Sequence, residues 1–347
     1  MQRLDRRELL RRAGQLGVSA TGLALLAGCS GLSTSVAPAA SPRSDAPLET
    51  TTLRFAKNPS LCNAPLYLAD DLLRAKGFTN VQYVDITTTT LPAVAAGQAD
   101  MAMGAAGVPI VRADADDSVV ILGGVHVGCM ELFASSAVRS MSDLKGKRVA
   151  APDQGSGNHV HFAAMAAYVG IDPIRDLTLI HDPAADAVRQ FSAGQVDAYM
   201  GFPPWPQELR AKGIGHVIVN THTDRPWSQY FCCVLVANRA FVEQHPVATK
   251  RGLRAVLEAA DICAAEPERA AQEMVNRGFT DDVGHALQML KHDVAYDRWR
   301  GYDPEDTVRF FSLRLQEVGM IKSSPNDIIA RGTNWRFLNE LKQELKA

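Results

Sequence analysis

The sequence predicts an α/β fold made of two similar lobes, and an internal repeat is the first observation behind this prediction. Residues 96–104 read AGQADMAMG and residues 193–201 read AGQVDAYMG, with six of nine positions identical. Each copy predicts a helix, a glycine that ends it in the left-handed conformation, a short buried strand and a second glycine. Two copies are too few for a solenoid, so we expect two lobes. Coincidence between two helix-to-strand turns is the alternative.

Strands that alternate with helices are the second observation, because this order is typical of parallel sheets. Ligands of such proteins bind beyond the carboxyl ends of the strands, where both repeats place their last glycine. We therefore expect each lobe to be a doubly wound, mostly parallel sheet with helices on both faces, followed from Asn238 by a mostly helical chain. Strands are expected at 53–56, 81–86, 101–103, 119–122, 129–134, 148–151, 177–181, 196–200 and 231–237.

The N-terminus predicts export. Paired Arg6 and Arg7 followed by leucines resemble the twin-arginine signal, which exports folded proteins. Residues 14–26 form an apolar run that is too short for a stable transmembrane helix. The LAGC sequence that ends at Cys29 resembles the bacterial lipoprotein box.

These signals place the protein outside the cytoplasm. We expect 1–28 to be an export signal, Cys29 to be lipidated, and 29–50, rich in Ser, Ala and Pro, to be a flexible tether. An ordinary secretory signal cleaved nearby is the alternative. The predicted location is the periplasm or the cell surface, with the lipid on Cys29 as the membrane anchor.

Charge and cysteine content exclude several classes of function. The 347 residues carry a net charge of −2, which gives no reason to expect a nucleic-acid partner. Apart from Cys29, five cysteines remain, an odd number without C-x-x-C spacing, so neither a disulfide framework nor a zinc knuckle is expected. One disulfide outside the cytoplasm is the alternative, and the sequence does not indicate which cysteines would form it. His126 and Cys129 are three residues apart, but no third ligand is spaced for a metal. We therefore expect no metal and no cofactor.

Four short segments occur in a particular order after residue 50: APLYLA at 64–69, AGQADMAMG at 96–104, SDLKGKRVA at 142–150 and AGQVDAYMGFPP at 193–204. Together they resemble the extracytoplasmic solute-binding proteins of ABC importers, in the branch that serves nitrate, taurine, alkanesulfonates and thiamine pyrimidine precursors. The resemblance extends over residues 52–347.

The resemblance implies the two-lobe type II periplasmic-binding-protein fold. The first lobe is then split between 51–133 and 235–347, and the second lobe, 134–234, is inserted into it. Strands at 132–134 and 233–235 would form the hinge, and the lobes would close over a ligand bound between them.

The resemblance also implies a function without chemistry: capture of a small organic solute or anion and its delivery to the permease and ATPase subunits of an importer. A thiamine-pyrimidine-synthase-like enzyme and a tethered ligand sensor are the alternatives. The lipoprotein box argues against the enzyme, which is intracellular, and the sequence contains no G-x-S-x-G motif or P-loop. Family members often have Trp-Glu-Pro where this chain has FPP at 202–204, so a ligand that needs that carboxylate is less expected.

Candidate ligand contacts lie in loops that precede helices, because helix N-termini offer unpaired N–H groups and a positive dipole end. These loops contain no Arg or Lys, which favours a neutral or singly charged ligand. The polar candidates have helix capping as their alternative role, and the aromatic candidates have core packing. We expect the ligand site to comprise Cys62, Asn63, Thr88, Gly104, Ala105, Ser156, Gly157, Asn158, His159, Phe202, Trp205 and Tyr230, and no catalytic residue.

Overall fold

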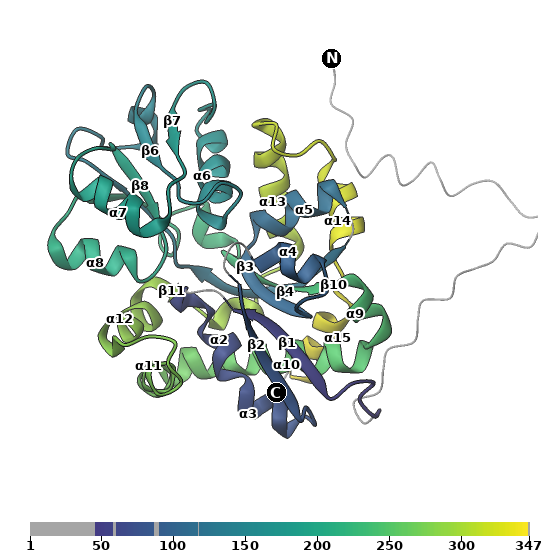
Figure 1. Cartoon of the computed structure of the whole chain (residues 1–347). Helices are drawn as coiled ribbons and strands as arrows, with labels where there is room; N and C mark the ends of the chain where they lie inside the picture. Colours follow the sequence, from purple (N-terminus) through teal and green to yellow (C-terminus); the bar gives the residue numbers. More distant parts are fainter. Residues whose placement is uncertain (1–45, 58–59, 87–89, 117, 346–347) are drawn as a thin grey trace, which may run out of the picture. The chain divides into compact units, whose positions relative to one another are not determined.

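The computed structural model describes residues 46–57, 60–86, 90–116 and 118–345, which form two sheets with helices packed around them (Figure 1). The predicted export signal, Cys29 and Thr88 lie outside these residues. The first sheet has the strand order β11-β4-β10-β3-β1-β2 and the second has the order β7-β6-β8-β5-β9. The strands are β1 (Thr52–Lys57), β2 (Asn80–Asp85), β3 (Met101–Ala105), β4 (Val119–Gly128), β5 (Glu131–Ala134), β6 (Arg148–Ala150), β7 (Thr178–Ile180), β8 (Ala198–Gly201), β9 (His216–Asn220), β10 (Cys233–Asn238) and β11 (Val294–Ala295).

The pairing of the strands confirms the α/β class and corrects one detail. Strands β1, β2 and β3 pair in parallel, and so do β6, β7 and β8. Strands β10 and β11 in the first sheet and β5 in the second pair antiparallel with their neighbours. Both sheets are therefore mixed rather than mostly parallel, because the chain returns through each sheet in the opposite direction.

Helices connect the strands and, as expected, make up most of the chain after Asn238 (Figure 1). The α-helices are α2 (Ala64–Leu68), α3 (Asp70–Ala75), α4 (Thr90–Ala95), α5 (Gly107–Ala115), α6 (Gly157–Tyr168), α7 (Ala184–Ser192), α8 (Trp205–Lys212), α9 (Arg239–Gln244), α10 (Pro246–Ala265), α11 (Pro267–Asn276), α12 (Val283–Gln288), α13 (Pro304–Glu317), α14 (Pro325–Gly332) and α15 (Arg336–Glu344). Short 3-10 turns are η1 (Leu61–Asn63), η2 (Met141–Leu144), η3 (Trp227–Gln229) and η5 (Asp297–Trp299), and η4 (Met289–Asp293) is a π-turn. Among the described residues, no helix has the length and apolarity that crossing a membrane requires.

The AGQ repeat forms the same structure twice. Gly97 and Gly194 follow α4 and α7 with φ of 70° and 69°, so both end their helices in the left-handed conformation. Asp100 accepts a hydrogen bond from the backbone N–H of Arg54, at 2.7 Å, on the neighbouring parallel strand. Asp197 accepts the equivalent bond from Arg148, at 2.9 Å, in the second sheet. The shared aspartate thus joins two parallel strands in each sheet, which confirms the repeat as structural.

The chain passes between the two sheets at two places. Residues 129–130 connect β4 of the first sheet with β5 of the second, and residues 221–232 lead from β9 back to β10. The boundaries predicted from the sequence, at 133/134 and 234/235, run through β5 and β10, whereas pairing assigns all of β5 to the second sheet and all of β10 to the first. The division into two lobes that move remains a prediction.

Candidate functional site

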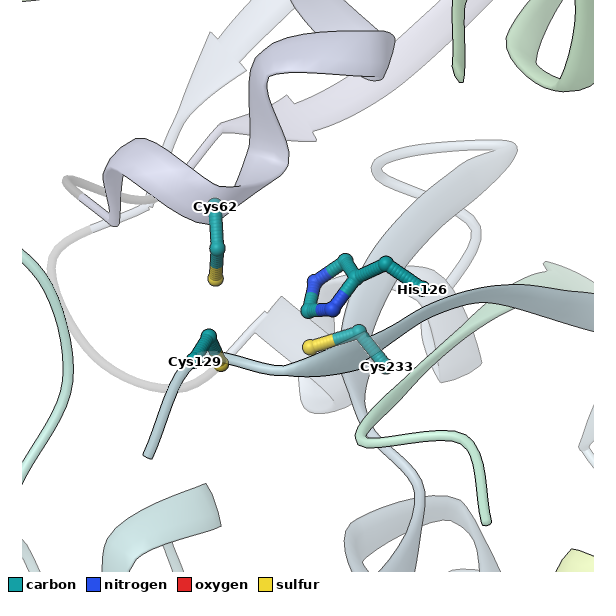
Figure 2. Close-up of side chains that lie close together, drawn as sticks. All are labelled: Cys62, His126, Cys129 and Cys233. Atoms are coloured by element: carbon teal, nitrogen blue, oxygen red, sulfur yellow. The ribbon is translucent and has the colours of Figure 1, made fainter. Parts of the chain in front are cut away.

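Three cysteines and a histidine meet in the interior near the first of these crossings. The ligand atoms of Cys62, His126, Cys129 and Cys233 all lie within 4.8 Å of one another. We call these four residues the thiol–imidazole cluster. Figure 2 shows their side chains pointing toward one another from separate segments of the chain. None is more than 4% exposed.

Strand pairing places two members of the cluster side by side. Cys233 opens β10 and lies directly opposite His126 of β4, and residues opposite each other in an antiparallel pair point to the same face. The third member, Cys62, lies in η1 at the start of α2, and its Sγ is 3.1 Å from the Ser60 hydroxyl.

Cys129 is positioned by an unusual backbone. Gly128 and Cys129 have φ of 89° and 86°, so two successive residues are in the left-handed region. This region is unfavourable for a residue with a side chain, and such strain is concentrated at functional sites. The Cys129 N–H donates to the Asp293 carbonyl at 2.9 Å, which holds the turn. A fifth buried side chain, that of Cys232, lies with its sulfur 3.3 Å from the Cys129 sulfur.

The electrostatics of the cluster couple thiols to the imidazole. The side chain of Cys129 forms a hydrogen bond that lowers the pKa of the Cys233 thiol to about 6. Burial lowers the pKa of His126, but interactions with Cys233 and Cys62 together outweigh this effect and raise the pKa to about 10. Neither ring nitrogen of His126 has a hydrogen-bond partner among the described residues. Three thiols and an imidazole are also a donor set that binds metal ions.

Some of the residues predicted to bind ligand lie next to this cluster. Ala105 pairs with Cys233, and Gly104 with Val234, across the first sheet. A Cβ atom on Gly157, at the start of α6, would lie 2.6 Å from the Ala105 Cβ and 3.3 Å from the Met130 methyl group. Glycine therefore lets α6, which also contacts β8 of the second sheet, approach the first sheet closely.

The N-terminus of α6 contains both capping residues and an unpaired polar atom. Ser156 is the N-cap: its hydroxyl accepts from the His159 N–H at 3.4 Å and donates to the Pro152 carbonyl. His159 Nδ1 accepts from the Gly155 N–H. Asn158 is only 3% exposed, yet its side-chain oxygen has no partner among the described residues. Capping thus accounts for Ser156, while Asn158 remains a candidate ligand contact.

The aromatic candidates pack against the protein. The Tyr230 ring stacks on Phe310 with centroids 4.1 Å apart, and Trp205 packs against the apolar core of the second sheet. Phe202 is half-buried, and its carbonyl accepts from the Trp205 N–H. Asn63 is buried beside Cys62, where its N–H donates to the Ser60 carbonyl. These contacts do not bring the three aromatic rings to the thiol–imidazole cluster.

A buried polar network, which the sequence did not predict, joins the two sheets near Cys129. Arg210 of α8 pairs with Glu131 at the start of β5 and with Asp293 at 2.7 Å. Gln207 donates to Asp293 at 2.6 Å. Burial raises the pKa of Glu131 to about 7, although Arg210 acts in the opposite direction. The members of this network are far apart in sequence, so no local motif indicates it.

The sequence predicted no metal, because only His126 and Cys129 have a suitable spacing. The fold brings the remaining donors from η1 and β10, far away in sequence. Sequence spacing alone was therefore not sufficient to judge this site. Cys62 and Ala105, which were predicted as ligand contacts, do lie at or beside the cluster.

Comparison with known protein families identifies the family of this chain. A model of the NMT1-like family matches residues 46–277, a span that contains both AGQ segments and the whole thiol–imidazole cluster. The chain belongs to the NMT1-like family.

Relatives of this NMT1-like protein include proteins named as parts of transport systems and a protein named for binding a solute. It is 28% identical to the nitrate import ATP-binding protein NrtC of Synechocystis over 197 residues, which cover 54% of this chain and 29% of NrtC. It is 26% identical over 184 residues to an ABC transporter periplasmic binding protein of Brachyspira hyodysenteriae. These residues cover 53% of this chain and 50% of the relative. The bicarbonate-binding protein CmpA of Synechococcus elongatus is 28% identical over 109 residues, which cover 31% of this chain and 24% of CmpA. The chain thus spans half or less of the length of these relatives.

Solved structures confirm the two-lobe type II fold. The periplasmic nitrate-binding protein NrtA from Synechocystis has a TM-score of 0.72 at 18% identity, covering 86% of this chain and 90% of NrtA. The alkanesulfonate-binding protein SsuA from Xanthomonas axonopodis, bound to MOPS, has a TM-score of 0.64 at 19% identity. The match covers 82% of this chain and 99% of SsuA. The desulfurization enzyme DSZB also shares the fold, with a TM-score of 0.58 at 16% identity. The match covers 84% of this chain and 99% of DSZB. The fold alone therefore does not separate binding from catalysis.

Proposed function

We propose that this NMT1-like protein is an extracytoplasmic solute-binding lipoprotein that captures a small organic solute or anion between its two sheets and delivers it to an ABC-type importer. The observation that carries this proposal is Asn158. Its amide oxygen is buried without a described partner at the N-terminus of α6, where this helix of the second sheet meets Ala105 of the first. A buried polar atom without a partner costs free energy unless a bound molecule satisfies it.

The relatives suggest which solutes to test first. NrtA is named for nitrate, CmpA for bicarbonate and SsuA for alkanesulfonates. These three solutes are all small anions. The N-terminus of α6, a helix of 12 residues, offers backbone N–H groups and a positive dipole end to an anion. The loop at 155–159 contains no Arg or Lys, so a singly charged anion or a neutral molecule suits it better than a dianion.

Binding can be tested on the exported domain by calorimetry with nitrate, bicarbonate, aliphatic sulfonates, aromatic acids and pyrimidines. For a solute that binds, Asn158→Ala should weaken binding by about 1–3 kcal/mol, the cost of an unsatisfied buried partner. Ser192→Ala is the matched control, because the Ser192 hydroxyl only donates to the Val188 carbonyl within α7. If the Asn158→Ala variant binds the solute as tightly as the wild type does, the solute binds at a different site.

The proposal also includes the lipid anchor and excludes catalysis. Cys29→Ser should leave unprocessed precursor and abolish acyl labelling in cells; unchanged labelling would contradict the anchor. The enzyme alternative predicts that a bound solute is converted on prolonged incubation, whereas a binding protein returns it unchanged on unfolding. A tethered sensor would bind the same solute, but deletion of the importer genes would then leave its response intact.

A further inference from the structure

We propose that the thiol–imidazole cluster binds one Zn²⁺ ion, held by the three thiolate sulfurs and one imidazole nitrogen. This site is independent of the proposed solute function. It uses only protein ligands, so the ion would be structural and would fix the junction at which the chain leaves the first sheet.

The geometry of the donors supports a tetrahedral ion. Zn–S bonds of about 2.3 Å and Zn–N bonds of about 2.0–2.1 Å place the donors of a site with three sulfurs and one nitrogen roughly 3.5–3.8 Å apart. The four donor atoms already lie within 4.8 Å of one another. The widest donor pair therefore has to close by about 1 Å to reach the metal-bound geometry.

The burial of His126 is the second, independent observation. The imidazole is 0% exposed, and neither nitrogen has a hydrogen-bond partner among the described residues. Besides the cluster, the Tyr296 ring packs near it with centroids 5.2 Å apart, and His161, whose pKa is lowered by burial, is close enough for His126 to lower that pKa further. A buried polar ring without a partner is unfavourable, and coordination of one nitrogen to a metal removes part of that cost.

The backbone at Cys129 also agrees with a ligand. Its left-handed conformation is unfavourable for a residue with a side chain. It occurs at the position whose sulfur lies within 4.8 Å of the other three donor atoms.

Charge and donor type favour Zn²⁺ over other ions. Sulfur-rich sites select zinc, Cu⁺ or iron–sulfur clusters, whereas calcium and magnesium require oxygen donors. Three thiolates carry three negative charges in a dry interior. A divalent ion leaves a smaller net charge there than Cu⁺ does, and a buried net charge is costly. Four protein ligands also leave no open position, which is typical of structural zinc.

The location explains what such an ion would stabilise. Its ligands come from three segments of the chain: η1, β4 with the turn that follows it, and β10. These segments meet where residues 129–130 pass to the second sheet. A single ion would therefore hold three elements together at one crossing of the fold.

The test is metal loading of the reduced, purified domain, with metal content measured by mass spectrometry and Co²⁺ absorption as a second readout. The wild type should bind one Zn²⁺ per chain, and Co²⁺ should show thiolate-to-metal charge transfer. Cys233→Ser and His126→Ala should each weaken binding by more than the roughly 10- to 100-fold typical for loss of an outer-shell partner. Circular dichroism checks that each variant is folded.

Two controls keep the proposal open to refutation even if a variant unfolds. Cys263→Ser removes an equally buried thiol of α10 that is not in the cluster, and Cys232→Ser removes the neighbouring thiol; both should keep one Zn²⁺ per chain. Failure of the reduced wild type to bind Zn²⁺, or binding that survives Cys233→Ser, would overturn the proposal. Binding of Cu⁺ without Zn²⁺ would overturn the choice of metal.

Discussion

The sulfur atoms of Cys129 and Cys232 lie 3.3 Å apart in the protein interior. A disulfide bond is about 2.05 Å long, so the two thiols are in contact but not bonded. Cys129 belongs both to this pair and to the thiol–imidazole cluster. A disulfide and a metal ion therefore compete for the same sulfur, and in an oxidising compartment the outcome depends on which forms first.

This competition gives the first prediction. Mild oxidation of the metal-free domain should consume two thiols and join Cys129 to Cys232, because their sulfur atoms are already in contact. Zn²⁺ should slow this reaction by holding Cys129 as a ligand. Alkylation followed by mass spectrometry measures the remaining thiols. Equal oxidation with and without Zn²⁺ would show that Cys129 is not held by the ion.

A second prediction concerns the two repeated aspartates. Asp100 accepts from the Arg54 backbone and pairs with its guanidinium at 2.6 Å, whereas Asp197 accepts from the Arg148 backbone. Asp100→Ala should cost about 2–3 kcal/mol of unfolding free energy, because hydrogen bonds to charged groups are worth about 1.5–3 kcal/mol. Asp197 is more exposed, and its replacement by alanine should cost about 1 kcal/mol. Urea unfolding of both variants measures the difference; equal losses would contradict the added role of the Arg54 side chain.

These aspartates show what the sequence predicts well. The repeat indicated a helix, a left-handed glycine and a short strand, and all three occur in both copies at the expected positions. Local patterns of this kind are set by nearest neighbours along the chain. The strand at 216–220 was not anticipated. Strand β4 runs on to Gly128, past Gly124, where a Cβ atom would lie 2.2 Å from the Phe231 ring.

The thiol–imidazole cluster, in contrast, could not be predicted from local sequence patterns. Its members are brought together by the register of β4 and β10 and by the left-handed turn at Cys129. Register depends on pairing between distant segments, and the sequence does not indicate which residues will lie opposite each other. A spacing rule detects ligands only when at least three lie close together in the chain.

A third prediction tests the close approach of α6 to the first sheet. Gly157→Ala places a Cβ 2.6 Å from the Ala105 Cβ, which is attached to a strand and cannot rotate away. We expect a loss of about 1–3 kcal/mol of unfolding free energy, typical of an overpacked site. Gly301→Ala is the matched control, because nothing lies within 4 Å of its Cβ position. It should be neutral or stabilise by up to about 1 kcal/mol. Equal stability of the two variants would mean that α6 moves away freely.

The fourth prediction is a dependence of stability on pH through His159. Burial, together with the nearby His181 ring at a centroid distance of 4.5 Å, lowers the pKa of His159 to about 4. The ordinary value of about 6.5 applies in the unfolded chain, so between these values the unfolded state binds more protons. The unfolding free energy should therefore fall as pH decreases from about 6.5 to about 4, by at most about 1.4 kcal/mol per pH unit for one proton. Partial exposure of the ring reduces the pKa shift and therefore the total loss of stability.

Urea unfolding of His159→Gln and of the wild type between pH 4 and 7 measures this contribution. The difference between the two proteins cancels the titrating groups that His159 does not influence, which leaves His159 and its neighbour His181. His159→Gln should lose less stability on acidification than the wild type does, because its side chain cannot take up a proton. His216→Gln, which replaces an exposed histidine of β9, should follow the wild type. If all three proteins lose stability equally, the environment of His159 does not disfavour its charged form, and the buried start of α6 is more hydrated than its contacts indicate.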